Sequence, residues 1–451
     1  MEYLDKLSYN MPVWSRIDDV PTQFAWLDED VECEICVVGG GVTGALCAME
    51  LAEDGHDVLM ITDGAVGMGE TARMAPCAVT DMGQNVVQMR RRLGEEQTAW
   101  MLNSAKEQLD RLEKLYGTFR DEASRGGDII GDMIPGEPTV SELYDFGFSR
   151  RDCFLYCDND SENELLAREY AERRRLHDDC VFTGRSAARD MFPFETAGGL
   201  ILRQQAAVLD PYRLTHNCLR RAMEAGARVY ENTKALRIDS AEDFFGDIEE
   251  RGWLITTGTH RLIDCERVVV AAGEACGELI DGVSAPRTRY TVVSHTLRGN
   301  GGWAGQCVLR TFSAYSPELT MATSPDGRIF ACGRSSSVMD EHARFAGVFR
   351  LPSVHEKRFA ELEAGARYLY ADRLREDTFE FAQAARECRT ADGMPIAGEI
   401  EGQEGCIFAV PGGGGVLMSM LCARTAADIC GGAEQPQQLS PQRRSLRARS
   451  A

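Results

Sequence analysis

The sequence predicts an α/β protein in which a Rossmann-like domain is interleaved with an antiparallel sheet. Three observations carry this prediction. A strand, a glycine turn, a helix and a second strand follow one another within Glu34 to Asp63. Near the C-terminus, another predicted strand ends in glycines between Ile407 and Gly415. Between residues 288 and 350, apolar and polar residues alternate. The first two patterns are typical of βα units in a parallel sheet, and the third is typical of antiparallel strands.

The first glycine turn predicts a dinucleotide site. An apolar run from Ile35 to Val38 stops at three consecutive glycines, helical spacing follows, and a second apolar run extends from Val58 to Ile61. Glycines at this place allow a tight turn and a close approach of the backbone to a pyrophosphate, which the N–H groups of the helix N-terminus attract. The predicted contacts are Gly39, Gly41, Val42, Thr43 and Gly44.

The residue that binds the ribose is left open between two neighbours. An acidic residue near the end of the second strand usually accepts hydrogen bonds from the ribose hydroxyls. Thr62 occupies the expected position, whereas Asp63 has the better chemistry.

The middle of the chain predicts further elements around this unit. Helical spacing extends from Gln84 to Tyr116 and again from Glu162 to Arg175. Asp210 and Pro211 open another helix. The run from Arg267 to Gly273 predicts a buried parallel strand whose small residues, Ala272 and Gly273, let a cofactor approach.

The later part predicts the antiparallel sheet and the second glycine turn. Ser324 to Gly327 reads as a turn between two strands, and helical spacing follows from Val354 to Tyr368. Gly412 to Gly415 then follow an apolar strand and precede a helix, so their backbone donors can also face a ligand.

Composition excludes several classes of partner. The chain has 451 residues, a hydrophobic content of 44% and a formal net charge of −22. This negative charge disfavours nucleic acid and anionic membranes as partners. No apolar stretch is long enough for a membrane span, and Met1 to Arg16 lacks the apolar region of a signal peptide. We therefore expect a cytoplasmic protein.

The cysteines indicate reduced thiols and no metal site. Sixteen cysteines are scattered through a large chain, many within apolar runs, where they serve as small core residues. The pairs Cys33/Cys36 and Cys153/Cys157 have no second pair or histidine partner that would complete a zinc pattern.

Several motifs, in this order, resemble the D-amino acid oxidase family of flavoproteins, which includes glycine and sarcosine oxidases. They are Gly39 to Gly44, Gly67 to Arg73, Asp210 to Tyr212, Ala272 and Gly273, Thr390 to Pro395, and Gly412 to Gly415. The resemblance implies a discontinuous FAD-binding domain (34–100, 200–280 and 388–443) interleaved with a substrate domain (101–199 and 281–387). Residues 1–33 form an N-terminal arm and residues 444–451 a flexible tail.

The resemblance also implies which residues hold FAD. The pyrophosphate lies at the first glycine turn, the ribose at Thr62 or Asp63, and the adenine against the backbone near Ala235. A loop and the second glycine turn hold the isoalloxazine ring: Gly69, Glu70, Thr71, Ala72 and Arg73, and Gly412, Gly413, Gly414, Gly415 and Val416. Cys388 does not match the spacing of covalent flavin attachment in relatives, so we expect non-covalent FAD.

The family chemistry removes a hydride from the carbon beside an amine and yields an imine that water hydrolyses. An arginine that binds the substrate carboxylate usually lies a few residues before the Asp-Gly turn. Arg386 and Arg389 flank that place, and Arg334 is a third candidate. The sequence leaves two alternatives open. Each of these arginines forms a surface salt bridge instead, or the substrate is an amine without a carboxylate.

Two other functions stay open at the level of sequence. One is a flavin-binding subunit whose catalytic pocket has decayed, suggested by the displaced arginine and by Thr62 in place of an acid. The other, an NAD(P)-dependent reductase, is weaker because no second GxGxxG unit is visible. The electron acceptor, whether oxygen, a quinone or a redox partner, is also open.

Overall fold

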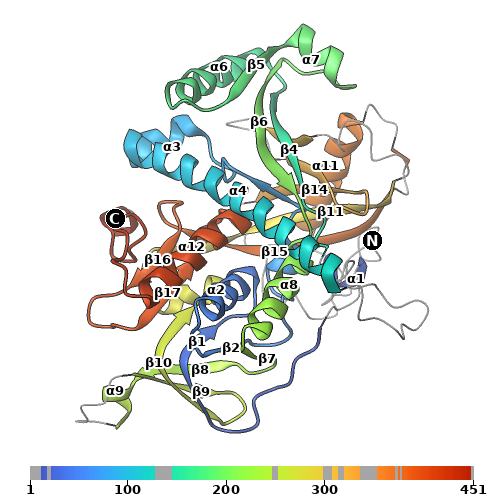
Figure 1. The fold of residues 1–451 in the computed structure, drawn as a ribbon. Helices are drawn as coiled ribbons and strands as arrows, with labels where there is room; N and C mark the ends of the chain where they lie inside the picture. The colour runs from blue at the N-terminus through green and yellow to red at the C-terminus, as the bar shows by residue number, and fades with distance from the viewer. Residues whose placement is uncertain are drawn as a thin grey trace.

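The computed structural model describes residues 12–17, 22–126, 145–245, 252–297, 307–312, 319–335, 353–370, 374–375 and 378–447. Two sheets and the helices packed on them make up the molecule (Figure 1).

The first sheet has eight strands and a parallel centre. Its main order is β16-β17-β10-β1-β2-β7, in which β17, β10, β1, β2 and β7 run parallel and β16 pairs antiparallel with β17. Strands β8 and β9 extend it from β10. The bounds are β1 Val31–Val38, β2 Val58–Ile61, β7 Arg228–Tyr230, β8 Ala235–Ser240, β9 Trp253–Thr257, β10 Leu262–Val270, β16 Ile396–Glu399 and β17 Cys406–Val410.

Both faces of this sheet are buried, as the unbroken apolar runs of its strands require. Ile35 and Val37 of β1 join the core formed with α2, α8 and α12, whereas Cys36 and Val38 join a core on the opposite face. The packed helices are α2 Val42–Glu53, α8 Pro211–Glu224 and α12 Gly415–Cys430. The predicted strand, turn, helix and strand at the start of the chain are confirmed.

The second sheet has nine strands and is mainly antiparallel. Its order is β15-β11-β14-β13-β12-β4-β6-β3, with β5 paired to β6 and only β12 and β4 parallel among the described strands. The bounds are β3 Cys77–Val79, β4 Ser149–Cys157, β5 Cys180–Gly184, β6 Gly198–Val208, β11 Val283–Thr296, β12 Cys307–Thr311, β13 Leu319–Thr323, β14 Arg328–Ser335 and β15 Phe379–Thr390.

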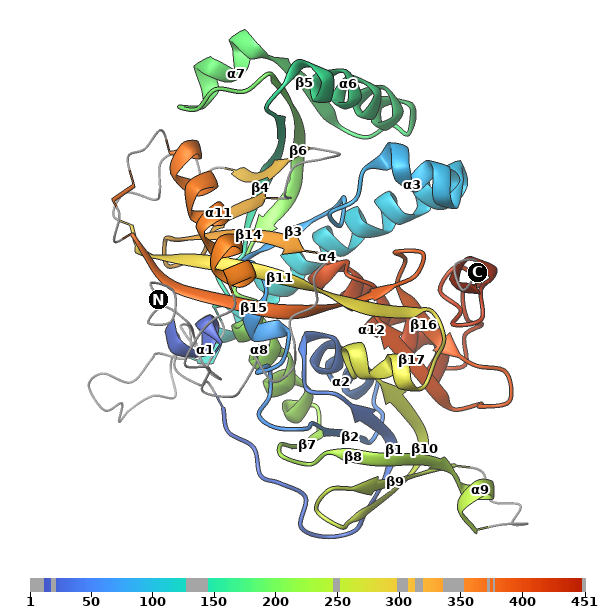
Figure 2. The ribbon, with the colours of Figure 1, turned by 180° about the vertical axis from the view of Figure 1, so that it is seen from behind.

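The chain passes repeatedly between the two sheets. β3 and β6 lie in the antiparallel sheet, although each is close in sequence to an element of the parallel one. Strands β11 and β15, at one edge of the antiparallel sheet, run across the middle of the molecule (Figure 2). The predicted interleaving of a Rossmann-like unit with an antiparallel sheet is confirmed, while the residue boundaries assigned to the two domains stay a proposal.

The remaining helices pack in several places, some on the second sheet and others on strands or helices of the first. They are α1 Val13–Ile17, α3 Val86–Leu93, α4 Glu95–Gly126, α6 Asp160–Arg175, α7 Arg185–Met191, α9 Ala241–Phe245, α11 Ser353–Leu369 and α13 Arg444–Arg447, with the short 3-10 helices η1 Thr71–Arg73 and η2 Gly273–Glu278. No helix in the described ranges is long and apolar enough to cross a membrane.

Two expectations about elements need correction. The helix expected from Gln84 to Tyr116 is two helices, because Gly94 takes a φ of 85° and ends α3. The parallel strand expected to reach Gly273 stops at Val270, and η2 follows.

The C-terminal residues that the structure describes are packed rather than flexible. Residues Arg444–Arg447 form α13, and Leu446 is buried. The Oγ of Ser445 donates to Asp392 at 2.6 Å. A buried apolar side chain and a partly buried hydrogen bond fix residues 444–447, which were expected to fray. Residues 448–451 lie outside the described part of the chain.

Candidate active site

The first glycine turn has the shape that a bound pyrophosphate requires. Gly39 has a φ of 125°, and a Cβ there would lie 2.4 Å from the carbonyl oxygen of Ala271 at the end of β10. A Cβ on Gly44 would lie 1.7 Å from the carbonyl oxygen of Gly39. Only glycine fits at these two positions, where β1, α2 and β10 converge. The first turn of α2 carries no acidic residue, so its N-terminus suits an anion.

The structure places Thr62 and Asp63 differently. Thr62 is buried against the turn, since a Cβ on Gly40 would lie 2.7 Å from its Oγ1. The carboxylate of Asp63 is exposed and lies 3.1 Å from Nζ of Lys234. The backbone N–H of Thr233 donates to the carbonyl of Thr62 at 2.8 Å, which brings the segment leading to Ala235 beside the end of β2.

The loop before η1 folds back onto the same turn. The N–H of Gly67 donates to the carbonyl of Gly40 at 2.8 Å, and Oγ1 of Thr71 accepts from the N–H of Val42 at 3.0 Å. Nη1 of Arg73 donates to the carbonyls of Met68 and Gly69 at 2.6 and 2.7 Å. Arg73 thus contributes to the shape of the loop itself.

The N-terminal arm holds this loop from the other side. Trp14 of α1 is buried, stacks on Phe330 with ring centroids 4.9 Å apart, and donates from Nε1 to the carbonyl of Met74 at 2.9 Å. The N–H of Val13 donates to Gln383 of β15, whose Nε2 reaches the carbonyl of Arg73.

The second glycine turn lies opposite the loop. Gly414 precedes α12, and a Cβ on Gly415 would lie 3.6 Å from Cε of Met74. Thr43 of α2 and Ser419 of α12 join the two helices through their hydroxyl oxygens, 2.9 Å apart. The structure therefore brings together the two glycine turns and the loop, which are far apart in sequence.

A cavity of about 100 Å³ lies where these parts meet the antiparallel sheet. Its walls come from the segment after η1, from strands β11, β12, β13 and β14, and from the second glycine turn. The lining residues are Met74, Ala75, Cys77, Ala78, Val79, Met82, Gly83, Arg289, Arg310, Thr320, Cys332, Gly333, Gly413, Gly414 and Gly415. Apolar walls with two guanidinium groups suit a small polar substrate.

Arg289 in β11 is one of the two cationic side chains of the cavity. Its Nη2 donates to Oε1 of Glu387 at 2.7 Å and lies 3.6 Å from Oε1 of Glu70. Glu387 is fully buried. Burial raises the pKa of Glu70 to about 7, against the opposite effect of Arg289.

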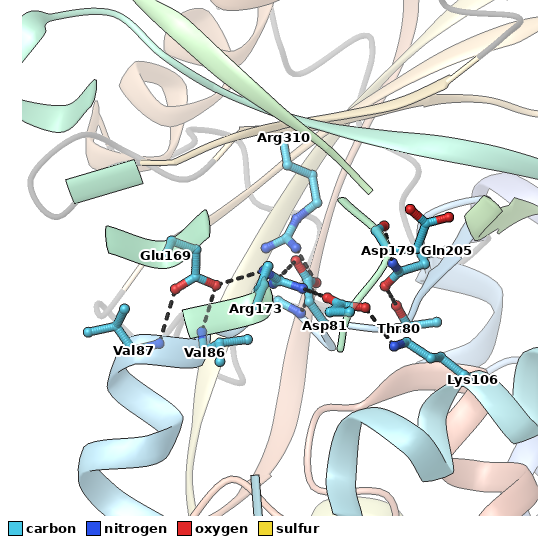
Figure 3. Close-up of polar contacts among 12 residues, drawn as sticks. Thr80, Asp81, Val86, Val87, Lys106, Glu169, Arg173, Asp179, Gln205 and Arg310 are labelled. Atoms are coloured by element: carbon cyan, nitrogen blue, oxygen red, sulfur yellow. Dashed lines mark hydrogen bonds and ion pairs between the residues drawn. The ribbon is translucent and has the colours of Figure 1, made fainter. Parts of the chain in front are cut away.

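Arg310 in β12 is the other cationic side chain and is 6% exposed. Its Nη1 donates to Oδ1 of Asp81, and Nη2 of Arg173 lies 3.7 Å from Oδ2 of the same carboxylate. Figure 3 shows the two guanidinium groups on either side of Asp81.

The three arginines predicted from the sequence have other surroundings. Nε of Arg386 lies 2.9 Å from Glu274 of η2. Arg389 packs on the second glycine turn, because a Cβ on Gly413 would lie 3.0 Å from its Nε. The backbone of Arg334 pairs with Arg289, and its side chain lies outside the described part of the chain. Arg386 and Arg389 are not among the described residues that line the cavity.

Two residues, Glu387 and Cys388, lie between Arg386 and Arg389. Position 387 carries a buried glutamate, and the guanidinium bonded to it comes from the neighbouring strand as Arg289. Sequence analysis missed Arg289 and Arg310, although both lie between residues 288 and 350, the region in which antiparallel strands were predicted. Period-two alternation along those strands was the available signal.

The sixteen cysteines are free thiols, most of them buried. Within the described ranges, no group of three or more histidine, cysteine, aspartate or glutamate side chains is placed to hold a metal ion.

A parallel sheet with a glycine turn at a helix N-terminus, covered by an antiparallel sheet over a small cavity, is typical of dinucleotide-binding proteins. The family model described as FAD dependent oxidoreductase, that of the D-amino acid oxidase family, matches residues 34–429. The chain belongs to this family of FAD-dependent oxidoreductases. The resemblance inferred from its motifs is confirmed.

Individual proteins give shorter or more distant matches. A gamma-glutamylputrescine oxidoreductase of Escherichia coli is 36% identical over 116 residues, 25% of this chain and 22% of that protein. A Bacillus subtilis protein named for a Rieske 2Fe-2S centre is 26% identical over 230 residues, 51% of this chain and 39% of that protein. These matches span less than two-fifths of either protein's length.

The fold itself matches solved structures over nearly the whole chain. Glycine oxidase from Geobacillus kaustophilus superposes with a TM-score of 0.66 at 18% identity, covering 89% of this chain and 95% of that one. At this identity the likeness concerns the fold.

Proposed function

We propose that this enzyme oxidises the C–N bond of a small amine or amino acid, with the cavity beside the second glycine turn as the substrate site. The observation that carries the proposal is the cavity itself, in which Arg289 and Arg310 lie close to Gly413–Gly415. Gamma-glutamylputrescine oxidoreductase and glycine oxidase, to which parts of the chain or its fold are similar, are named for amine substrates.

We propose that the residues predicted from the sequence hold FAD without a covalent bond. Side chains at Gly39 and Gly44 would clash with backbone, so the turn is tight enough for close approach of a pyrophosphate, and Cys388 is buried. The set is Gly39, Gly41, Val42, Thr43, Gly44, Thr62, Asp63, Gly69, Glu70, Thr71, Ala72, Arg73, Ala235, Ala272, Gly273, Gly412, Gly413, Gly414, Gly415 and Val416. When bound, FAD accepts the hydride that leaves the substrate.

The protein's own part is to orient the substrate and to keep its nitrogen neutral. The guanidinium groups at the cavity orient an anionic substituent, and the apolar wall formed by Met74, Ala78 and Met82 excludes water. Glu70, whose pKa lies near neutrality, is able to exchange a proton close to Arg289. The imine formed by oxidation is hydrolysed by water after release.

The cavity argues against the alternative of a decayed site. Arg289 and Arg310 line it beside Gly413–Gly415, so the cavity keeps cationic groups for an anionic substituent of a substrate. Arg334, Arg386 and Arg389 stay secondary candidates for the carboxylate anchor.

Turnover with an artificial electron acceptor tests the proposal. The FAD-loaded enzyme is incubated with a panel of amino acids, N-methyl amino acids and polyamines, and dye reduction and carbonyl products are measured. The matched control replaces each amino acid by the 2-hydroxy acid with the same carbon skeleton. Carbonyl product from an amine and none from its hydroxy counterpart supports the proposal. Turnover of the hydroxy acids alone contradicts it.

A further inference from the structure

Three cysteines meet in the first halves of two central strands of the parallel sheet. Cys33 of β1 and Cys265 of β10 are Cα partners in the register of these strands, which lie side by side (Figure 1). Cys36 and Cys265 belong to the core on the face of the sheet opposite α2, and Cys33 packs against the same core. All three are free thiols, so the sheet brings together thiols that lie far apart in the sequence.

Cys33 is the accessible member of this group. Cys33 and Cys77 are partly exposed, whereas the remaining cysteines of the chain are buried. Cys265 is 2% exposed, and Cys36 is fully buried. A small oxidant in solvent therefore reaches Cys33 before it reaches either neighbour.

The geometry of the strands decides which two thiols can be joined. Neighbouring strands lie about 4.7–4.9 Å apart, and the Cα atoms of a disulfide lie about 4.4–6.8 Å apart. Cys33 and Cys265 meet this condition through their register. Cys33 and Cys36 lie on one strand with about 10 Å between their Cα atoms, too far for a disulfide unless the backbone moves. Cys36 is opposite Val268, so it is also too distant from Cys265.

The surroundings of Cys33 favour its thiolate. The thiols of Cys265 and Cys36 donate hydrogen bonds to Cys33 and lower its pKa to about 5. Burial raises the pKa of Cys33, and the positive charge of Arg228 lowers it. Nη2 of Arg228 donates to the backbone carbonyl of the preceding residue at 2.9 Å and also to Asp57, whose negative charge acts against the thiolate. The thiolate is the form of cysteine that attacks an oxidant.

Cys265 keeps its proton in this arrangement. The hydrogen bond to Cys33 and burial raise the pKa of Cys265 above its ordinary value. Its Sγ also lies 3.5 Å from the carbonyl oxygen of Trp253, a second acceptor for the same proton. Cys33 is thus suited to be the nucleophile, and Cys265 is suited to be the thiol that reacts next.

We propose that Cys33 and Cys265 form a peroxide-reactive thiol pair that closes to a disulfide between β1 and β10. The Cys33 thiolate attacks one oxygen of hydrogen peroxide, the O–O bond breaks, and a sulfenic acid and hydroxide form. The sulfur of Cys265 then attacks the sulfur of Cys33, the S–O bond breaks, and the thiol proton leaves with that oxygen as water. The two sulfur atoms together lose two electrons, which reduce the peroxide.

This thiol pair lies apart from the proposed FAD and substrate sites. The glycine turn follows the last residue of β1, Val38, whereas Cys33 is near the beginning of that strand. Extended chain of this length separates Cys33 from Gly39 by about 20 Å. Cys33→Ala is therefore expected to leave FAD content and flavin reduction unchanged, and the inference does not rest on the proposed function.

Peptide mapping after treatment with hydrogen peroxide tests the proposal. The full-length, FAD-loaded protein is reduced, freed of reductant, treated with equimolar hydrogen peroxide, alkylated and digested for mass spectrometry. We expect two peptides joined through Cys33 and Cys265, lighter by two hydrogen atoms than the separate peptides. A link from Cys33 to Cys36 or to a second chain, or no loss of free Cys33, would overturn the proposal.

The rate of alkylation by iodoacetamide tests whether Cys33 is the thiolate. Cys77 is the internal comparison, because it is also partly exposed while burial raises its pKa to about 12. At pH 7 we expect Cys33 to react at least about tenfold faster than Cys77, and its rate to change little between pH 6 and pH 8. Equal rates, or a rate for Cys33 that rises about tenfold per pH unit, would overturn its role as nucleophile.

Variants separate the roles of the three cysteines. Cys33→Ala is expected to abolish the rapid loss of thiols with peroxide. Cys265→Ala is expected to leave Cys33 as a sulfenic acid, which dimedone traps. Cys36→Ala is the matched control: it removes a buried neighbour that the register keeps from bridging, and the link between Cys33 and Cys265 is expected to form.

Two results from the variants would contradict the proposal. One is loss of thiols in Cys33→Ala that is as fast as in the parent, and the other is absence of the link in Cys36→Ala. If Cys265→Ala fails to fold, the peptide map of the parent protein decides the partner of Cys33 by itself.

Discussion

Single residues at the first glycine turn set how closely α2 approaches β1. A methyl group at position 44 would fall 1.7 Å from the carbonyl oxygen of Gly39, which is backbone and has no room to move away. We expect Gly44→Ala to lower stability by about 1–3 kcal/mol through overpacking and to reduce the FAD content of the purified protein.

Gly117 offers the matched control for this substitution. It lies in α4, and nothing stands within 4 Å of a Cβ placed on it. Gly117→Ala is expected to raise stability by about 0.5–1 kcal/mol, because alanine is the better helix former, and to leave FAD content unchanged. Normal FAD content in Gly44→Ala would contradict the pyrophosphate assignment.

The raised pKa of Glu70 predicts that the stability of the folded protein depends on pH. Its pKa in the folded protein is raised to about 7, chiefly by burial, from an ordinary value of 4.5. Between these values the folded state binds the proton more tightly than the unfolded state, so stability falls as the pH rises from 4.5 through 7. Glu70→Gln removes this contribution.

The measurement is the Tm of the apoprotein and of Glu70→Gln from pH 5 to pH 8. The Tm of the variant minus the Tm of the parent is expected to increase as the pH rises through this window. Parallel curves would show that Glu70 is not shifted. The side chain is 35% exposed, so the effect is smaller than full burial would give.

At the scale of elements, the arm before the first strand is part of the site. Trp14 is 1% exposed and bonds to the carbonyl of Met74, which lines the cavity. We expect Trp14→Ala to cost about 3–5 kcal/mol of stability and to weaken FAD retention, because the loop Thr71–Arg73 loses a neighbour.

Trp26 in the same arm is the control, since its side chain is 63% exposed. Trp26→Ala is expected to change the free energy of unfolding by no more than about 0.5 kcal/mol. Denaturant unfolding of both variants, with FAD fluorescence as a second readout, checks the pair. Similar losses in both would contradict a specific role for the arm.

Elements were predictable where their signal is local. The strand, turn and helix around Gly39 follow from adjacent residues, and so does the turn at Ser324. The break at Gly94 was missed, because apolar spacing continues across it while the backbone takes a positive φ. The packed C-terminal segment was missed because its partner, Asp392, lies 53 positions from Ser445.

At the scale of the whole molecule, the family and the fold were predictable but the substrate side of the site was not. The order of the glycine motifs along the chain identifies a dinucleotide fold. The bond between Arg310 and Asp81 joins positions 229 apart in the sequence, and Arg289 reaches Glu387 across 98. Spacing along the sequence carries no signal for such distant pairs. It therefore predicted Arg386 and Arg389 as site residues and did not identify Arg289 and Arg310.

We expect the whole protein to oxidise an amine and, in the same reaction, to reduce its bound flavin. This central claim joins the family, the two glycine turns and the cavity with its two arginines. The absorption spectrum of the purified protein is recorded before and after anaerobic addition of pooled D- and L-amino acids, N-methyl amino acids and polyamines. We predict a flavin spectrum that bleaches on addition of a carboxylated amine. A flavin spectrum that every amine leaves unchanged and that NADPH bleaches would contradict the account.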